Sequence, residues 1–165
     1  MAASPKKSLA LDTNLLLDLA GEQDFAHEFM EEFSSRGYFM FVPPTVISEL
    51  AFFSALKDAP QNRLANIALE NFSGWKLQPV VLTSTELAIA VRFAARLADA
   101  TIIPESELND GKILAQTSLA RIPLLVTSDK HLLDADEDAL LLAFNDADMS
   151  PVHPSHPRRL LKALR

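Results

Sequence analysis

The chain has 165 residues, of which 48% are hydrophobic and 22% are charged, so we expect one globular domain over residues 1–165. It contains no cysteine, which excludes disulfides, thiolate zinc sites and a cysteine nucleophile and fits a reducing compartment. The net charge of −7 at pH 7 argues against an extended basic surface for nucleic acid, because phosphate contacts require positive charge.

The N-terminal stretch MAASPKKSLALDTNLLLDLA resembles a signal peptide, because two lysines precede a leucine-rich run. Asp12, Asn14 and Asp18 interrupt the apolar segment that such a peptide needs, so we reject that interpretation. No apolar run approaches the ~20 residues that span a bilayer. We therefore expect a cytoplasmic protein without a membrane segment.

The first half of the chain alternates apolar runs with helical patterns. Residues 8–12 (SLALD) are typical of a strand buried on both faces of a parallel sheet. Helices are predicted over 14–20 and 25–35, the second with phenylalanines at helical spacing. A second strand over 38–42 ends at two prolines, after which Thr45 can cap a helix that continues to residue 57.

The second half continues the alternation. A helix is predicted over 61–73, followed by a strand over 76–82 in which Pro79 indicates an edge or a bulge. Ser84 or Thr85 begins the next helix, and Asn109-Asp110 caps another before a fourth strand over 122–128. The remaining elements are a helix over 137–147, an extended segment over 149–154 and a helix over 156–164. This order predicts a parallel α/β sheet with helices on both faces.

Four acidic side chains are predicted to approach one edge of this sheet. Asp12 and Asp129 lie at the carboxyl ends of the first and fourth strands, where open parallel sheets bind ligands. Asp110 begins the helix that leads into the fourth strand, and Glu49 has apolar neighbours one helical turn away on both sides. Singly, Asp129 or Asp110 could be a turn or cap residue. Together the four acids would repel one another unless they are protonated or bind a divalent cation.

The order of these motifs resembles the PIN-domain family of metal-dependent nucleases. The resemblance runs from residue 9 to 133 through LALDTN (Asp12), VISEL (Glu49), NDGKILAQTSL (Asp110) and LLVTSDKHLL (Asp129). It implies a three-layer α/β/α sandwich around a central, mostly parallel twisted sheet. It also implies that the four acids form a catalytic pocket for Mg²⁺ or Mn²⁺, which hydrolyses RNA to 5′-phosphate and 3′-hydroxyl ends.

The resemblance further implies supporting residues and partners. Asn14 and Thr127 stand where the family's asparagine and threonine help to orient the acids. Many small bacterial members are toxins that pair with an antitoxin and often dimerise, so we expect an antitoxin partner and a homodimer. The insert ATIIPESEL before Asp110 is longer than the family pattern, so Glu105 or Glu107 could replace or supplement Asp110.

Other functions of a parallel α/β fold fit the sequence less well. A phosphotransfer receiver domain needs an acidic pair near the first strand and an aspartate ending the third, but SLALDTN holds one acid and QPVVLTS none. A dehalogenase-like phosphatase needs a second aspartate two residues after the first, where this chain has Asn14. A PIN-like module that binds RNA or acts as a scaffold without catalysis stays open, because the chain is acidic.

Several further side chains have two interpretations. His153 and His156 lie three apart, but the prolines beside them favour an extended loop over a zinc pair. The basic tail over 158–165 is either a phosphate-binding surface or favourable charge at the end of a helix. Phosphate contact or solvated surface is open for Arg92, Lys112 and Lys130. We expect a place in the core or in a subunit interface, and not a base-stacking role, for Phe25, Phe29, Phe33, Phe52 and Phe53.

Overall fold

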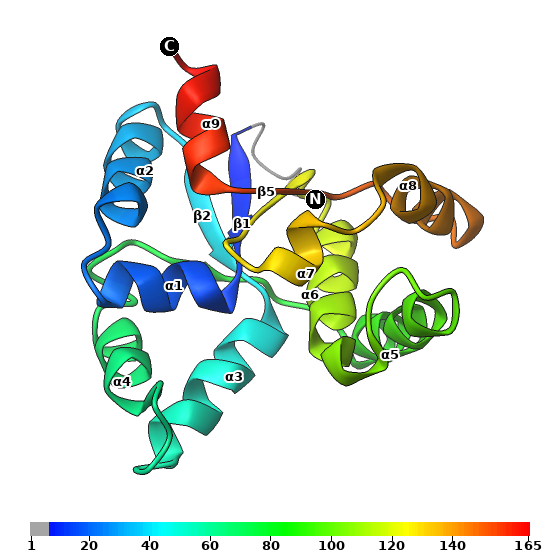
Figure 1. Cartoon of the computed structure of the whole chain (residues 1–165), viewed down its shortest axis with the longest axis horizontal. Coiled ribbons are helices and arrows are strands. Elements are labelled where there is room, and N and C mark those ends of the chain that lie inside the picture. Colours follow the sequence, from blue (N-terminus) through cyan, green and yellow to red (C-terminus); the bar gives the residue numbers. More distant parts are fainter. Residues whose placement is uncertain (1–6) are drawn as a thin grey trace.

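The computed structural model describes residues 7–165 and contains a five-stranded, all-parallel sheet between two layers of helices (Figure 1). Residues 1–6, which the single-domain prediction and the signal-peptide argument include, lie outside the described residues. The strands are β1 (Ser8–Leu11), β2 (Phe39–Val42), β3 (Gln78–Pro79), β4 (Leu124–Val126) and β5 (His153–Ser155). The predicted α/β/α fold is thus confirmed.

The strand order is β3-β2-β1-β4-β5, so β1 lies at the centre and β3 at an edge. All four residues of β1 are buried, as expected for an apolar strand covered on both faces. Pro79 pairs only at this edge, which agrees with its prediction, because proline cannot donate to a second neighbour. The segment predicted only as extended contains the fifth strand, whose His153 pairs with Leu124.

Ten helical segments connect or follow the strands within residues 7–165. They are α1 (Thr13–Ala20), α2 (Asp24–Ser35), α3 (Pro44–Ala55), α4 (Asn62–Glu70), α5 (Ser84–Asp99), the short 3₁₀ helix η1 (Glu105–Glu107), α6 (Leu108–Leu119), α7 (Lys130–Leu133), α8 (Glu137–Asp146) and α9 (Pro157–Ala163). The connections place α1, α2 and α4 on one side of the sheet and α5, α6 and α8 on the other (Figure 1). Helix α9 packs against α2.

Two predicted helix caps are wrong. Helix α3 begins two residues earlier than expected, at Pro44 with Pro43 as its N-cap, because proline fits the first helical position without needing an amide donor. The backbone N–H of Thr45 instead donates to Gln116 Oε1 at 3.0 Å, and Gln116 Nε2 donates to Thr45 Oγ1 at 2.8 Å. Helix α6 follows η1 directly and has Glu107 at its N-cap, so Asn109-Asp110 lies inside the first turn.

The packing of α5 against α6 fixes the position of that first turn. Gly111 is buried, and a Cβ atom there would lie 2.8 Å from both Cα and Cβ of Ala94. Only glycine therefore allows α6 to approach α5 this closely. Because Asp110 is the preceding residue, the same contact determines where its carboxylate lies.

The phenylalanines divide between the core and the surface. Phe29 and Phe33 of α2 are buried, so both rings pack in the core of the domain. Phe52, in contrast, is 60% exposed on α3, so it lies outside the core, and the subunit-interface alternative stays a prediction. Within residues 7–165, every helix is too short or too polar to cross a membrane.

Candidate active site

Asp12 is anchored by the strand next to its own. Its backbone N–H donates to Val126 of β4 at 3.0 Å, and its side chain is buried, with the residue only 2% exposed. The buried Thr127 donates from Oγ1 to Asp12 Oδ2 at 2.7 Å and accepts the backbone N–H of Asp129 at 2.9 Å. One threonine hydroxyl thus connects the acids that follow β1 and β4.

Glu49 is held by residues from two other elements. It lies in the second turn of α3 and is half-buried. Thr13, the first residue of α1, donates from Oγ1 to Glu49 Oε1 at 2.6 Å. Asn109 of α6 donates to the other carboxylate oxygen across a longer distance of 3.4 Å. Helices α1, α3 and α6 therefore meet at this carboxylate.

Asp110 has an incomplete set of partners. The residue is 6% exposed, and its Oδ2 is the one buried side-chain oxygen or nitrogen within residues 7–165 that lacks a hydrogen-bond partner. Buried polar atoms in folded proteins almost always have a partner. An acceptor of this kind fits a ligand that brings positive charge or hydrogen-bond donors.

The charges of Glu49 and Asp129 act on the ionisation of Asp12 and Asp110. Burial raises the pKa of Asp12 to about 7; the hydrogen bonds from Thr127 and from the backbone of Thr13 oppose this rise, while the charges of Glu49 and Asp129 add to it. Burial also raises the pKa of Asp110 to about 8, and the charges of Asp129, Asp12, Glu107 and Glu49 contribute. All four predicted acids therefore interact electrostatically at this site.

The acids form a cluster but not a complete set of metal ligands. In the described part of the chain, no three His, Cys, Asp or Glu side chains stand in an arrangement that could hold a metal ion. Two of the carboxylates are instead directed to hydroxyl donors, Asp12 to Thr127 and Glu49 to Thr13. The hydrogen bond from Thr127 stabilises the charged form of Asp12 and so opposes the rise in its pKa.

Of the two predicted supporting residues, only Thr127 forms a side-chain hydrogen bond to an acid in the described part of the chain. Thr127 bonds directly to an acid, whereas Asn14 is exposed, and the side-chain hydrogen bonds to the acids within residues 7–165 come from other residues. Thr13 was not among the predicted site residues, although its position directly after Asp12 at the start of a helix is a usable signal. Of the two alternative glutamates, Glu107 raises the pKa of Asp110 and lies 3.9 Å from His131, whereas Glu105 is exposed.

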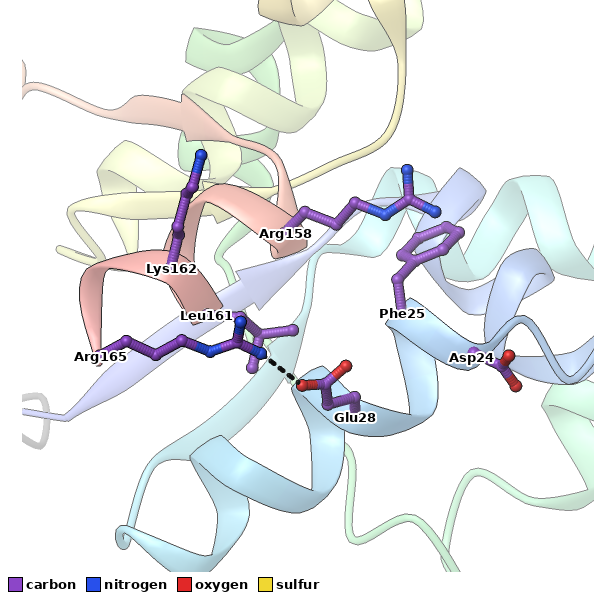
Figure 2. A pocket seen from close by; sticks show the side chains of 7 residues that line it. All are labelled: Asp24, Phe25, Glu28, Arg158, Leu161, Lys162 and Arg165. Carbon is purple, nitrogen blue, oxygen red and sulfur yellow. Dashed lines mark hydrogen bonds and ion pairs between the residues drawn. The ribbon is translucent and has the colours of Figure 1, made fainter.

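The two histidines do not act as a pair, and the basic tail packs against α2. His156 caps α9 by accepting the Arg158 N–H at 3.1 Å, and His153 lies 3.5 Å from Glu137, so they form no pair around a metal. A cavity of about 430 Å³ lies between α2 and α9 (Figure 2), and Arg165 forms an ion pair with Glu28 there at 3.2 Å. Arg158 lies 4.9 Å from the centre of the Phe25 ring. These contacts fasten the tail to α2.

Two acids follow the first and fourth strands of this parallel sheet, and α3 and α6 each add another. This arrangement is the one expected of the PIN-domain family. The family model of the PIN domain matches residues 9–138, and the chain belongs to this family.

Solved structures of bacterial proteins share this fold. The chain is similar to VapBC2 from Rickettsia felis bound to a DNA fragment from its promoter, with a TM-score of 0.60, 15% identity, and coverage of 90% of this chain and 98% of that one. It is similar to VapBC-1 from nontypeable Haemophilus influenzae, with a TM-score of 0.57, 13% identity, and 92% and 98% coverage. It is also similar to FitAcB from Neisseria gonorrhoeae, with a TM-score of 0.53, 15% identity, and 90% and 97% coverage. No curated protein matches the chain in sequence.

Proposed function

We propose that this protein is a metal-dependent endoribonuclease in which Asp12, Glu49, Asp110 and Asp129 hold Mg²⁺ or Mn²⁺. The observation that carries the proposal is the buried, partnerless Oδ2 of Asp110 inside a group of mutually repelling acids. Carboxylate oxygens are the ligands that these hard cations prefer. A cation would satisfy the oxygen and remove the repulsion, so the donor set fits the metal.

The chain's own residues would hold the acids in place around the ion. A bound divalent ion supplies a water of lowered pKa and neutralises negative charge on the phosphate. Thr127 and Thr13 hold Asp12 and Glu49 in fixed orientations through short hydrogen bonds. The protons that Asp12 and Asp110 retain near neutral pH would leave when the site is loaded, because metal ligands must be deprotonated.

We also propose that the chain is the toxin of a toxin–antitoxin pair, acts in the cytoplasm as a homodimer and is blocked by an antitoxin. The support is the family and the likeness to VapBC and FitAcB chains, which this chain covers almost completely. The short length of the chain also agrees with this group.

A non-catalytic RNA-binding or scaffold module is the second candidate. Two observations favour it: the net charge of −7, and the lack, within residues 7–165, of three ligands arranged around a metal. Such a module would bind RNA or a protein through the same surface and leave the phosphodiester intact.

The test compares cleavage of labelled single-stranded RNA by the intact protein in Mg²⁺, in Mn²⁺ and in chelator. We expect cleavage only with metal, its loss in Asp12→Asn, and its retention in Asp146→Asn, which changes an exposed aspartate of α8. Cleavage in chelator, or normal cleavage by Asp12→Asn, would contradict the proposal. Binding without cleavage in either metal would favour the module.

A further inference from the structure

A pocket beside the acids has features that the proposed chemistry does not use. It lies between α3 and α6, measures about 580 Å³, and is lined by Glu49, Phe52, Asn109 and Lys112 among others. Its size is within the range of pockets that hold small organic ligands. Because Glu49 lines this pocket and also belongs to the acid cluster, the pocket begins where the proposed cleavage takes place.

The pocket contains an exposed aromatic ring. Phe52 follows Glu49 by three residues on the same face of α3 and is 60% exposed. Its ring centre lies 5.8 Å from that of Phe53, with 62° between the ring planes, so the neighbouring ring meets it edge to face. A solvent-exposed ring in a pocket is a surface on which an unstacked nucleobase can lie.

The pocket also contains a cation without a protein partner. Lys112 lies two residues after Asp110 on α6, and within residues 7–165 no carboxylate forms an ion pair with it. Lys112 is the one basic residue among those that line the pocket, and its charge can attract a phosphate group. The amide of Asn109 adds a polar group to the wall between the lysine and Glu49.

We propose that this pocket binds the base of a nucleotide adjacent to the cleaved phosphodiester of single-stranded RNA, with the base on Phe52 and a backbone phosphate near Lys112. The inference rests on the proposed ribonuclease function and names the form of RNA that it takes. Stacking on one ring accepts any of the four bases, so the pocket selects unpaired RNA rather than a sequence. The ring, the lysine and the shared Glu49 favour a nucleotide over an apolar protein segment.

The experiment uses an eight-nucleotide, fluorescently labelled RNA and a series in which each position in turn lacks its base. Affinity is measured by anisotropy in chelator at low salt, so that no metal and no cleavage contribute. For the intact protein, one abasic position is expected to weaken binding about tenfold, the effect of losing one stacked base. Phe52→Ala should weaken binding of the complete RNA by a similar factor. Removing the base at the sensitive position should then cause no further loss of affinity.

Two variants serve as controls. Phe52→Trp keeps a stacking ring and should restore the penalty of the abasic position. Leu142→Ala removes an equally exposed side chain from α8, also 60% exposed, and should bind as the unchanged protein does. Equal weakening of complete and abasic RNA by Phe52→Ala would overturn the base-binding role. Unchanged RNA affinity of Phe52→Ala would overturn it too, and would favour a protein segment as the occupant of the pocket.

Cleavage measured in parallel separates this inference from the proposed function. If the intact protein cleaves RNA with Mn²⁺ but Phe52 is not coupled to any base, the pocket assignment fails and the ribonuclease stands. If the coupling is present but no metal supports cleavage, the base site stands and the ribonuclease fails. If the protein neither cleaves nor binds RNA, both proposals are wrong.

Discussion

Thr13 donates a hydrogen bond to Glu49 over 2.6 Å, although 36 positions separate the two residues in the chain. Thr13 is buried and directly follows Asp12, so the start of α1 provides one acid and fixes the orientation of another. Residues that orient metal ligands are often as important for a site as the ligands themselves. The site therefore depends on how α1 and α3 meet.

Replacing Thr13 by Val removes this donor and keeps the volume of the side chain nearly unchanged. We expect Mn²⁺ affinity and RNA cleavage to fall about 10-fold, because Glu49 loses its fixed orientation. Thr13→Ser should retain most of both, and Thr85→Val, at an exposed position of α5, should change neither. Full activity of Thr13→Val would show that Glu49 needs no such support.

The stability of the metal-free protein should fall as the pH rises from about 4 to about 8. Burial, the main cause, raises the pKa of Asp12 to about 7 and that of Asp110 to about 8, from 3.8 in the unfolded chain. Over this range the folded state therefore holds more protons than the unfolded state, so the free energy of unfolding decreases with pH. Each unit of pKa difference corresponds to about 1.4 kcal/mol.

Thermal melts in chelator at pH 5, 6, 7 and 8 measure this effect. Their midpoints should decrease steadily for the unchanged protein, and much less for Asp12→Asn combined with Asp110→Asn, which removes both titrating groups. Asp12→Asn alone should be more stable than the unchanged protein at pH 8. A midpoint that is constant or rises over this range would contradict the assignment of the repulsion to these acids.

Glu105 and Glu107 provide a matched pair within one short helix. Glu107 contributes to the raised pKa of Asp110, whereas Glu105 is not among the causes of that rise. We expect Glu107→Gln to lower the affinity for Mn²⁺ several-fold, because it removes negative charge near the site, and Glu105→Gln to have no effect. Equal effects of the two substitutions on a calorimetric titration would show that only the total charge matters.

Gly111→Ala tests whether the contact of α6 with α5 sets the position of Asp110. The added methyl group would lie 2.8 Å from the backbone of Ala94, so the helices must separate, at a cost of about 1–3 kcal/mol. We expect a lower unfolding midpoint in urea and a loss of RNA cleavage. Gly74→Ala is the control, since its nearest neighbour would lie at 3.6 Å, and it should leave both nearly unchanged.

The sequence predicts the main elements of this fold well because their physical signals are strong. The strand of residues 8–11 is an uninterrupted apolar run, and the phenylalanines of α2 repeat at helical spacing. The start of α6 was misplaced because Asn109-Asp110 has the chemistry of a cap, while η1 extends the helix beyond it. Strand β5 has only three residues and contains Pro154, so no local pattern distinguishes it from a loop.

The positions of the acids could be predicted from the sequence, whereas, apart from Thr127, the side chains that contact them could not. Strand ends of a parallel sheet meet at one edge, which is why Asp12 and Asp129 could be placed together. The hydrogen bond from Thr13 to Glu49 depends on how two helices pack, which no local pattern contains. The exposure of Phe52 likewise depends on the space between α3 and α6, whereas an isolated helix pattern places that ring in an apolar stripe.

We propose that a divalent cation relieves the repulsion among these acids. The most direct test of this proposal is a calorimetric titration of Mn²⁺ into the metal-free protein at pH 7, in two buffers that differ in their heat of protonation. We predict saturable binding with net release of protons, because Asp12 and Asp110 must lose theirs, and strongly weakened binding by Asp110→Asn. No saturable binding, or binding that Asp110→Asn leaves unchanged, would contradict the account.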